Sequence, residues 1–319
     1  MSEVENPVDT VVRLLSKNMR VIMEDGLLAP VHVSREWLNR ELFKGVDGQV
    51  TVGLAESHDT KIELSGRLRR RLGTLRVNVW SQDANIRQKM VEEINRIVRQ
   101  NRNKPNETLY GFAGVGQNSE THKAYSAGAS SELEPENASW SELANTDYEK
   151  IWYRDDNRYS KSHNVNGEYA LLLFRFKIES REKTVKRIVL AFEGYGKAPA
   201  GNGATIKVWN HIASAWQNAQ SGTGGADETL TITLDSNLTD YIDGDGYVWL
   251  LARTTNPSNG AIPATLHCDY VSCTVTVNGI TYLDIVSFRD ADRVDVKPFI
   301  YHTEFTLKSW SFEDIGGVF

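Results

Sequence analysis

The stretch VKPFIYHTEFTLKSWSF, residues 296–312, decides how we expect this chain to fold. Apolar and polar residues alternate along it, which is typical of a β-strand with one buried face. The residues on the apolar side are Phe299, Tyr301, Phe305 and Leu307. Trp310 and Phe312 have the opposite parity, which predicts a bulge or a change of face. A strand of this length needs a sheet to join, because its backbone groups need partners.

The N-terminal part of the chain offers such a sheet. Residues 8–23 place apolar side chains three and four positions apart, which predicts an amphipathic helix that Asp25 and Gly26 end. Strands are expected at 30–33, 48–55 and 72–80, and a second helix in SQDANIRQKMVEEINRIVRQNR, residues 81–102. Asp83 is its expected N-cap. Three strands leave a sheet edge bare, so we expect the C-terminal strand to return to this sheet.

The composition changes near residue 117, where GQNSETHKAYSAGASSELEPENAS has the character of a loop or linker. About eight short strands follow, separated by turns rich in Gly, Asn and Asp, which predicts a jelly roll or similar β-sandwich. Most of them are expected at 168–179, 185–193, 204–209, 228–234, 247–253 and 265–277. We therefore expect an α+β domain, a small mixed sheet with two helices, at 1–117 and 283–319, interrupted by an inserted all-β domain at 118–282. Simple tandem domains are the alternative.

The composition limits the class of protein. A length of 319 residues fits two domains, and no apolar run approaches the roughly 18 residues that a transmembrane helix needs. The acidic, polar start argues against a secretory signal. No nucleophile motif, P-loop or zinc-ligand spacing is present, so we expect no enzyme and no cofactor. Cys268 and Cys273 are expected to be buried thiols, and His211 and His302 structural histidines.

The net charge of −6 hides a segregation of charge along the chain. Residues 61–104 contain 12 Lys and Arg against 4 Asp and Glu, whereas residues 227–245 contain 6 Asp and Glu and no Lys or Arg. The basic part includes four clustered arginines, which are Arg67, Arg69, Arg70 and Arg71. Base-stacking aromatics do not accompany them. A basic rim along a passage, or a contact with an acidic partner subunit, fits this pattern, and a solvated surface loop fits it equally well.

Two further groups of residues are candidate sites. The acidic turn DYIDGDG offers the carboxylates of Asp240, Asp243 and Asp245 to Ca²⁺, but it lacks the closing glutamate of a calcium loop, so a solvated turn is preferred and no metal is expected. Aromatic residues of the expected sandwich could form a sugar-stacking platform, with the core of the sandwich as their alternative location. The platform residues are Trp209, Trp216 and Tyr195, with Tyr247 and Trp249 nearby.

The order of elements, together with the run V-x-V-W-x-x-D followed by R-x-x-M-x-x-E-I-x-R-I, resembles the tail terminator and related neck proteins of tailed bacterial and archaeal viruses. The resemblance covers residues 8–117 and 283–319. It implies a homo-oligomeric ring, usually a hexamer, that caps the tail tube. The implied partners are the tail tube protein, a head-side connector or adaptor protein, and genomic DNA that passes through the lumen non-specifically. The implied location is the neck of the virion, after assembly in the host cytoplasm and without a membrane.

On this interpretation the four arginines lie on a loop between strands and face the DNA channel or an acidic partner ring. The insertion at 118–282 departs from the family, whose typical members are much smaller, and would decorate the outside of the ring. Two other functions stay open: a head-completion or adaptor role in the same neck, and a carbohydrate-binding adhesin or baseplate-type protein that acts through its sandwich. A glycoside hydrolase would need a carboxylate pair in a cleft, and the sequence singles out none.

Overall fold

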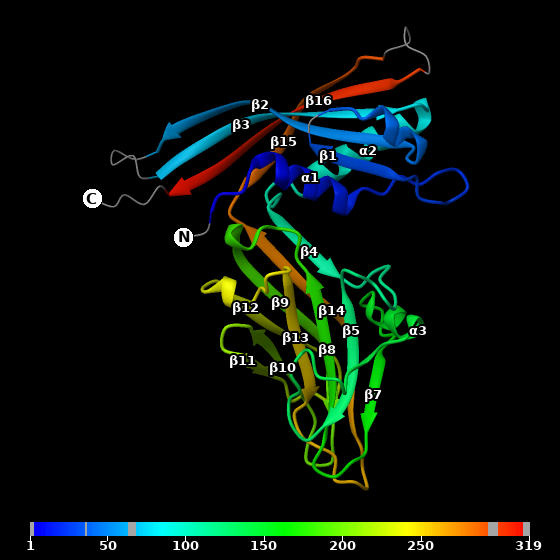
Figure 1. Ribbon diagram of the computed structural model, residues 1–319, viewed down its shortest axis with the longest axis vertical. Coiled ribbons are helices and arrows are strands. Elements are labelled where there is room, and N and C mark those ends of the chain that lie inside the picture. Colours follow the sequence, from blue (N-terminus) through cyan, green and yellow to red (C-terminus); the bar gives the residue numbers. More distant parts are fainter. Residues whose placement is uncertain (1–2, 36, 63–67, 293–298, 315–319) are drawn as a thin grey trace. The chain divides into compact units, whose positions relative to one another are not determined.

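The computed structural model of the protein describes residues 3–35, 37–62, 68–292 and 299–314. The chain forms two compact units (Figure 1). The first unit consists of Glu3–Thr108 and Val277–Phe319, and the second of Leu109–Thr276. The first unit is therefore discontinuous in sequence. Its boundaries lie inside two strands, whereas the sequence analysis placed them at residues 117 and 283.

The first unit is a five-stranded sheet with two helices. Its elements are α1 Pro7–Asn18, β1 Val31–Arg35, a 3-10 turn at Arg40–Lys44, β2 Gly48–Lys61, β3 Leu68–Ser81, α2 Ala84–Gln100, β15 Tyr282–Asp290 and β16 Tyr301–Asp314. The sheet order is β1-β2-β3-β16-β15, with β1 parallel to β2 and the other pairs antiparallel. The expected return of the C-terminal strand is confirmed, because β16 pairs with β3 along its whole length, from Tyr301 opposite Ser81 to Asp314 opposite Leu68.

Side-chain caps set the starts of both helices. The side chain of Asn6 accepts the N–H of Val8, and Asp83 Oδ1 accepts the N–H groups of Asn85 and Ile86, as expected for Asp83. The helix expected at 8–23 is shorter than predicted. It ends at Asn18. The chain then turns back on itself, and the N–H of Ala29 donates to the carbonyl of Val21.

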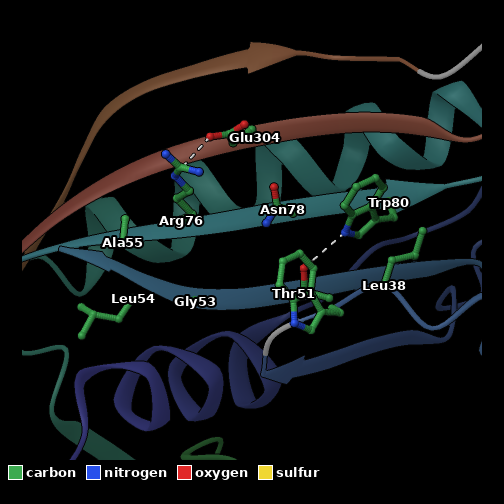
Figure 2. Close-up of a pocket in the computed structure, with 10 residues that line it drawn as sticks. Leu38, Thr51, Gly53, Leu54, Ala55, Arg76, Asn78, Trp80 and Glu304 are labelled. Carbon is green, nitrogen blue, oxygen red and sulfur yellow. Dashed lines mark hydrogen bonds and ion pairs between the residues drawn. The ribbon is translucent and has the colours of Figure 1, made fainter.

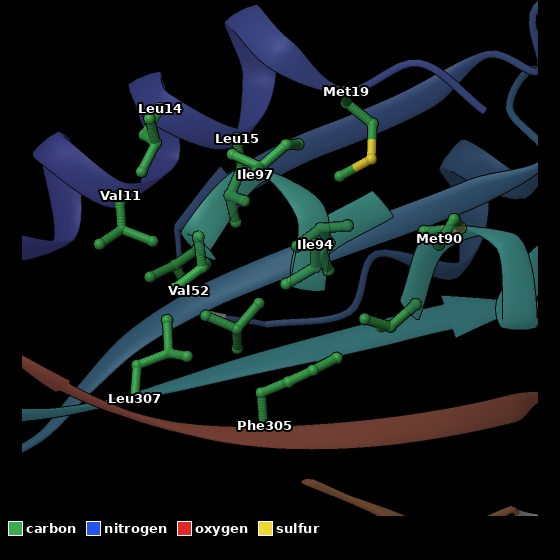
Figure 3. Packing of buried hydrophobic residues seen from close by; sticks show 14 of the residues in the cluster. Val11, Leu14, Leu15, Met19, Val52, Met90, Ile94, Ile97, Phe305 and Leu307 are labelled. Atoms are coloured by element: carbon green, nitrogen blue, oxygen red, sulfur yellow. The ribbon is translucent and has the colours of Figure 1, made fainter. Parts of the chain in front are cut away.

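Both helices pack on one face of the sheet (Figure 3). The strands supply alternate side chains to this core, and the helices supply one stripe each. The fully buried members include Val11, Leu15, Val52, Leu75, Val77, Ile94, Ile97, Phe305 and Leu307. The bulge expected near Trp310 is wrong, because β16 pairs with β3 without a register shift and Trp310 stacks on Tyr282 with ring centroids 3.6 Å apart. The bulge lies instead in β15, between Ile285 and Ser287.

The second unit is mostly β-structure in two sheets, with short helical turns. Its strands are β4 Glu107–Gly111, β5 Lys123–Ala129, β6 Ser141–Glu142, β7 Tyr159–His163, β8 Tyr169–Lys177, β9 Val185–Lys197, β10 Ala204–Asn210, β11 Ala215–Ser221, β12 Glu228–Leu234, β13 Tyr247–Thr254 and β14 Ala264–Val277. The helical turns are α3 Asn145–Tyr148, Glu149–Ile151, Glu182–Thr184 and Leu238–Asp240. One sheet has the order β11-β10-β13-β8-β5-β6, and the other has the order β12-β9-β14-β4 with β7 beside β14.

The two sheets of this unit pack face to face, which confirms the expected β-sandwich. Phe174 of β8 and Phe192 of β9 lie with ring centroids 6.3 Å apart, and Phe112 packs against Phe174 at 5.9 Å. Cys268 and Cys273 are free and fully buried, as expected, and burial raises the pKa of both thiols.

The stretch after residue 117, which was expected to be a loop or linker, is only partly irregular. It contains β5, which pairs with β8 and β6 inside the six-stranded sheet. Most residues of β5 are Ala, Ser or Gly, which carry a weak strand signal. Within the described residues, no helix is long and apolar enough to cross a membrane.

Candidate functional site

The face of the five-stranded sheet opposite the helices carries a groove of about 670 Å³ (Figure 2). Side chains alternate along a strand, so the residues between the core positions point to this face. The groove is lined by Trp37, Leu38, Thr51, Gly53, Leu54, Ala55, Arg76, Asn78, Trp80 and Glu304. Most of these come from the middle of β2, β3 and β16.

Trp80 and His302 form the stacked floor next to this groove. Their rings are nearly parallel, with centroids 3.7 Å apart. Trp80 Nε1 donates to Thr51 Oγ1 at 3.3 Å, and His302 Nε2 lies 3.0 Å from Asn78 Oδ1. Burial lowers the pKa of His302. His302 is thus a structural histidine that fixes the Trp80 ring, as the sequence analysis expected.

The rim of the groove is apolar on one side and charged on the other. Trp37 is 85% exposed and Leu54 is 46% exposed. On the other side, Glu304 lies 3.6 Å from Arg76 Nε and accepts a hydrogen bond from Arg289 at 3.2 Å. An exposed indole beside an apolar depression is the kind of surface that receives a side chain of another protein.

The sequence analysis predicted that the arginine cluster lies on a loop. In the structure its described members lie on a strand instead. Arg69, Arg70 and Arg71 belong to β3 and pair with β2 and β16, and Arg67 lies outside the described residues. Both neighbouring strands extend as far as these positions, so the backbone there has partners on two sides. Arg71 Nε donates to Asp59 Oδ1 at 2.8 Å, and this hydrogen bond lowers the pKa of Asp59.

Of the proposed sugar-stacking residues, Trp209 and Trp216 lie together and Tyr195 lies apart from them. Trp209 and Trp216 make an edge-to-face contact on the outer face of the six-stranded sheet, with centroids 5.1 Å apart and with Trp249 in the same cluster. Tyr195 lies on β9 in the other sheet and stacks on His267 at 4.3 Å. Trp209 and Trp249 are buried in this separate hydrophobic cluster, whereas phenylalanines fill the space between the two sheets.

A segment between β5 and β6, residues 130–140, covers this outer aromatic cluster. Trp216 Nε1 donates to the carbonyl of Leu133, and Trp140 Nε1 donates to the carbonyl of Glu134, both at 2.9 Å. Glu132 of the same segment forms ion pairs with a lysine of β10 and an arginine of β13, at 2.7 and 2.9 Å. Trp209 and Trp249 are each only 8% exposed as a result.

A second cavity, of about 370 Å³, lies where this segment meets the acidic turn between the 3-10 turn at Leu238–Asp240 and β13. It is lined by Glu134, Pro135, Glu136, Trp209, His211, Asp243, Gly244, Asp245 and Trp249. Asp243 Oδ1 accepts hydrogen bonds from the backbone N–H groups of Asp245 and Tyr247, at 3.0 and 2.8 Å. The carbonyl of Asp240 accepts a hydrogen bond from the backbone N–H of His211. The acidic turn is thus held by the side chain of Asp243 and by a backbone hydrogen bond.

Three further features bear on the chemistry of this cavity. Within the described residues, no group of three or more His, Cys, Asp or Glu side chains is arranged to hold a metal ion. His211 Nε2 is buried and has no hydrogen-bond partner among those residues. Burial lowers the pKa of His211.

Comparison with known proteins gives a match for the second unit. Residues 119–277 match the model of a family described as "Uncharacterized protein, C-terminal domain". No curated protein matches the chain.

Several solved structures are similar to about half of the chain. A xylan-binding module, CBM15, has 13% sequence identity and a TM-score of 0.29, and the match covers 54% of this chain and 98% of the module. The enzymatically active domain of tailspike protein 4 from bacteriophage CBA120 has 9% identity and a TM-score of 0.24, covering 53% of this chain and 19% of that one. A family 11 carbohydrate-binding module from Clostridium thermocellum has 10% identity and a TM-score of 0.22, covering 54% and 89%. The proposals below rest on the residues of this chain.

The sequence analysis did not foresee a group of carboxylates on the smaller sheet of the sandwich. Asp269 of β14 is 2% exposed, and its Oδ1 has no hydrogen-bond partner among the described residues. Burial raises the pKa of Asp269, and the neighbouring carboxylates of Asp227 and Glu193 raise it further. Asp227 accepts a hydrogen bond from Arg158 Nε at 2.7 Å, and Glu193 pairs with Arg154 at 2.9 Å.

This environment predicts that Asp269→Asn stabilises the protein at pH 7. When a carboxyl group has a higher pKa in the folded protein than in the unfolded chain, the free energy of unfolding falls as the pH rises from the unfolded pKa through the folded pKa. An asparagine keeps the shape without the charge that burial and the carboxylates of Asp227 and Glu193 disfavour, so we expect a gain of about 1 kcal/mol or more, the scale of one unit of pKa difference. Urea denaturation of the wild type and the variant, at pH 7 and at pH 3.5, measures this gain in the free energy of unfolding. The gain should vanish at the lower pH, and an equal gain at both pH values would contradict the charge argument. Asp227→Asn, which loses the pair with Arg158, is the control and should destabilise.

Proposed function

We propose that this chain is a structural protein of a tailed virus. It forms a ring at the head–tail neck, terminates the tail tube and connects it to the head. On this proposal the first unit is a tail-terminator-like α+β domain, and the second is an inserted jelly-roll domain that decorates the ring. Its partners are copies of itself, the tail tube protein and a head-side connector or adaptor, with DNA in the lumen. Its mechanism is assembly rather than catalysis.

The observation that carries this proposal is the uncovered sheet face of the first unit. Two helices bury one face of the sheet, and the other face holds the groove next to Trp80 with Trp37 at its rim. An indole that is 85% exposed gains stability when a partner covers it, since burial of apolar surface is favourable by about 25 cal/mol per Å². A protein whose task is to assemble has reason to keep such a surface open.

The edges of the sheet support a ring rather than a closed dimer. Among the described residues, the terminal strands β1 and β15 each pair with one neighbour in the sheet. On β15, Val286 is 61% exposed and Phe288 is 54% exposed. An apolar edge and an apolar groove are different surfaces of one unit, so a contact between them is heterologous. Heterologous contacts close into rings when the rotation between copies allows it.

This proposal predicts that Trp37→Lys prevents assembly. Buried tryptophans at interfaces commonly contribute about 2 kcal/mol or more, so the assembly constant should fall by roughly thirtyfold or more. Mass photometry and negative-stain images of the purified chain, alone and with its tail tubes, measure ring formation. The matched control is Ile212→Lys, a residue of the second unit that is 79% exposed and lies between β10 and β11. A wild-type chain that stays monomeric at high concentration, with and without tail tubes, would overturn the proposal.

Carbohydrate binding through the sandwich is less well supported by the geometry. Stacking on a sugar needs an open aromatic face, and residues 130–140 cover Trp216 and Trp209. The cavity beside Trp209 and Trp249 is the part of the sandwich that a saccharide could enter, and its other walls are mainly acidic.

A further inference from the structure

A short hairpin between α1 and β1, residues 21–29, presents apolar side chains to solvent. Ile22 is 57% exposed, Leu27 is 63% exposed and Leu28 is 55% exposed. A single exposed apolar side chain is normal on a protein surface, whereas a group of them marks a surface that another molecule covers. The hairpin is therefore a candidate contact surface of the first unit.

The backbone of this hairpin fixes the direction of its side chains. Ile22 and Leu28 form a β-bridge between the two arms, so their side chains lie next to each other. Their neighbours Val21 and Ala29 are buried in the core that the sheet shares with the helices. Lys89 Nζ of α2 donates to the carbonyl of Ile22 at 2.9 Å. The hairpin is thus held at its base and turns its apolar side outward.

The groove on the opposite face of the sheet has the shape to receive such side chains. Gly53 lies in its lining, and a Cβ added there would meet no heavy atom within 4 Å. Beside it, β2 bulges between Leu54 and Glu56, and Leu54 contributes an apolar wall. The volume of about 670 Å³ lies within the roughly 300–1,000 Å³ of sites that enclose whole small ligands, so the groove has room for two leucine side chains.

Charge favours this hairpin as the occupant of the groove. At the rim of the groove, Arg76 and Arg289 are 63% and 75% exposed, and they share one carboxylate, that of Glu304. The hairpin carries two exposed carboxylates, Glu24 and Asp25, and no lysine or arginine in the described part of the chain forms an ion pair with either. The acidic turn of the hairpin therefore complements the excess positive charge of the rim.

The apolar edge of β15 fits the groove less well. Arg289 directly follows Phe288 on that strand and is itself one of the two rim cations, so the edge of a second copy would bring further positive charge to a positive rim. The ring of Phe288 also has a partner already, because it lies 5.3 Å from that of Phe305.

We propose that the hairpin of residues 21–29 of one copy inserts Leu27 and Leu28 into the groove beside Trp37 of the next copy. The base of the hairpin belongs to the core on the helix side of the sheet, and the groove lies on the other side, so the contact joins two different surfaces. Such a contact is heterologous and can repeat around a ring. This inference rests on the proposed ring and names one of its subunit contacts.

Two variants of the full-length chain remove the contact from either side. Leu27→Gln with Leu28→Gln takes the apolar side chains from the hairpin, and Gly53→Val fills the groove without a clash inside the chain. Each variant should weaken assembly at least about tenfold, because the burial of aliphatic side chains favours association. The control is Ile212→Gln with Ile262→Gln, residues of the second unit that are 79% and 54% exposed, which should assemble as the wild type does. Equal midpoints of urea denaturation show that all variants fold.

A mixture of the two variants shows which surfaces meet. The hairpin variant keeps its groove and the groove variant keeps its hairpin, so an equimolar mixture can form one contact but cannot extend it. Sedimentation velocity should therefore show 1:1 dimers in the mixture and no rings. Each variant alone, at the same total concentration, should form neither.

The remaining outcomes each contradict the contact in a different way. Normal rings of either variant would overturn the contact and leave the proposed ring intact. Loss of assembly in both variants without dimers in the mixture would show that the two surfaces do not meet. Loss in Gly53→Val and in Val286→Gln, with a hairpin variant that assembles normally, would assign the groove to the β15 edge instead. A hairpin variant that forms rings but no longer binds tail tubes would assign the hairpin to the tail tube protein. A wild type that stays monomeric, with and without tail tubes, would overturn both the contact and the ring.

Discussion

Phe305→Ala should lower the stability of the first unit by about 3–5 kcal/mol, the usual cost of removing a large buried aromatic side chain. Phe305 is fully buried on β16, opposite Val77 of β3, and its ring lies 5.3 Å from that of Phe288. Its substitution leaves a cavity in the core that α1, α2 and three long strands share. The C-terminal strands β15 and β16 are thus structural parts of a unit that is otherwise built from the N-terminal third of the chain.

Hydrogen–deuterium exchange resolves this prediction by region. Peptides from β3 and α2 should lose protection in Phe305→Ala, although they precede the substitution by more than two hundred residues in the sequence. Peptides from β8 and β9 of the second unit should keep theirs. Phe192→Ala, in the core between the sandwich sheets, is the matched control and should show the reverse pattern. Loss of protection confined to the last forty residues would contradict the shared core.

Glu5→Gln should destabilise the first unit by a similar amount, about 3–5 kcal/mol, because it removes one partner of a buried, hydrogen-bonded ion pair. Glu5 and Arg13 are 6% and 7% exposed, and their two hydrogen bonds measure 2.5 and 2.7 Å. The hydroxyl of Thr10 donates to the same carboxylate at 2.6 Å, and Arg13 Nε donates to Thr108 at 3.1 Å. The pair thus ties the start of α1 to the start of β4.

A double substitution separates the charge from the packing. Replacement of a whole buried pair by apolar residues is often close to neutral, so Glu5→Leu with Arg13→Met should lose less than half of what Glu5→Gln loses. Urea denaturation of the three proteins at pH 7 provides the comparison. Losses that simply add in the double variant would show that the ion pair is not the source of the effect.

Much of the first unit could be predicted from the sequence. The helix of 84–100 has its N-cap at Asp83 and a regular apolar stripe, and both signals are local. The return of β16 to the first sheet was predictable because a long alternating strand needs hydrogen-bond partners that three strands leave free. The helix end at Asn18 was missed because the turn that follows continues the apolar spacing of the helix.

The candidate sites were less predictable, because each depends on segments that are distant in sequence. The arginines at 69–71 looked like a loop, since nothing local shows that β2 and β16 extend far enough to flank them. The tryptophans looked like a sugar platform or a sandwich core, since nothing local shows that residues 130–140 cross their outer face. The groove is lined by the exposed side chain of Trp37 and by residues of three strands. The sequence does not show that these residues lie close together in space.

The sequence by itself determined the elements, the discontinuous first unit and the separation of basic from acidic segments, because periodicity, capping and charge are properties of neighbours along the chain. The tertiary structure alone decided which surfaces are open and which charges are neutralised. In the tertiary structure, residues 130–140 cover Trp216, and Asp269 is buried beside two other carboxylates. Burial and ion pairing act through space over a few ångströms, so they follow from which segments meet rather than from their order.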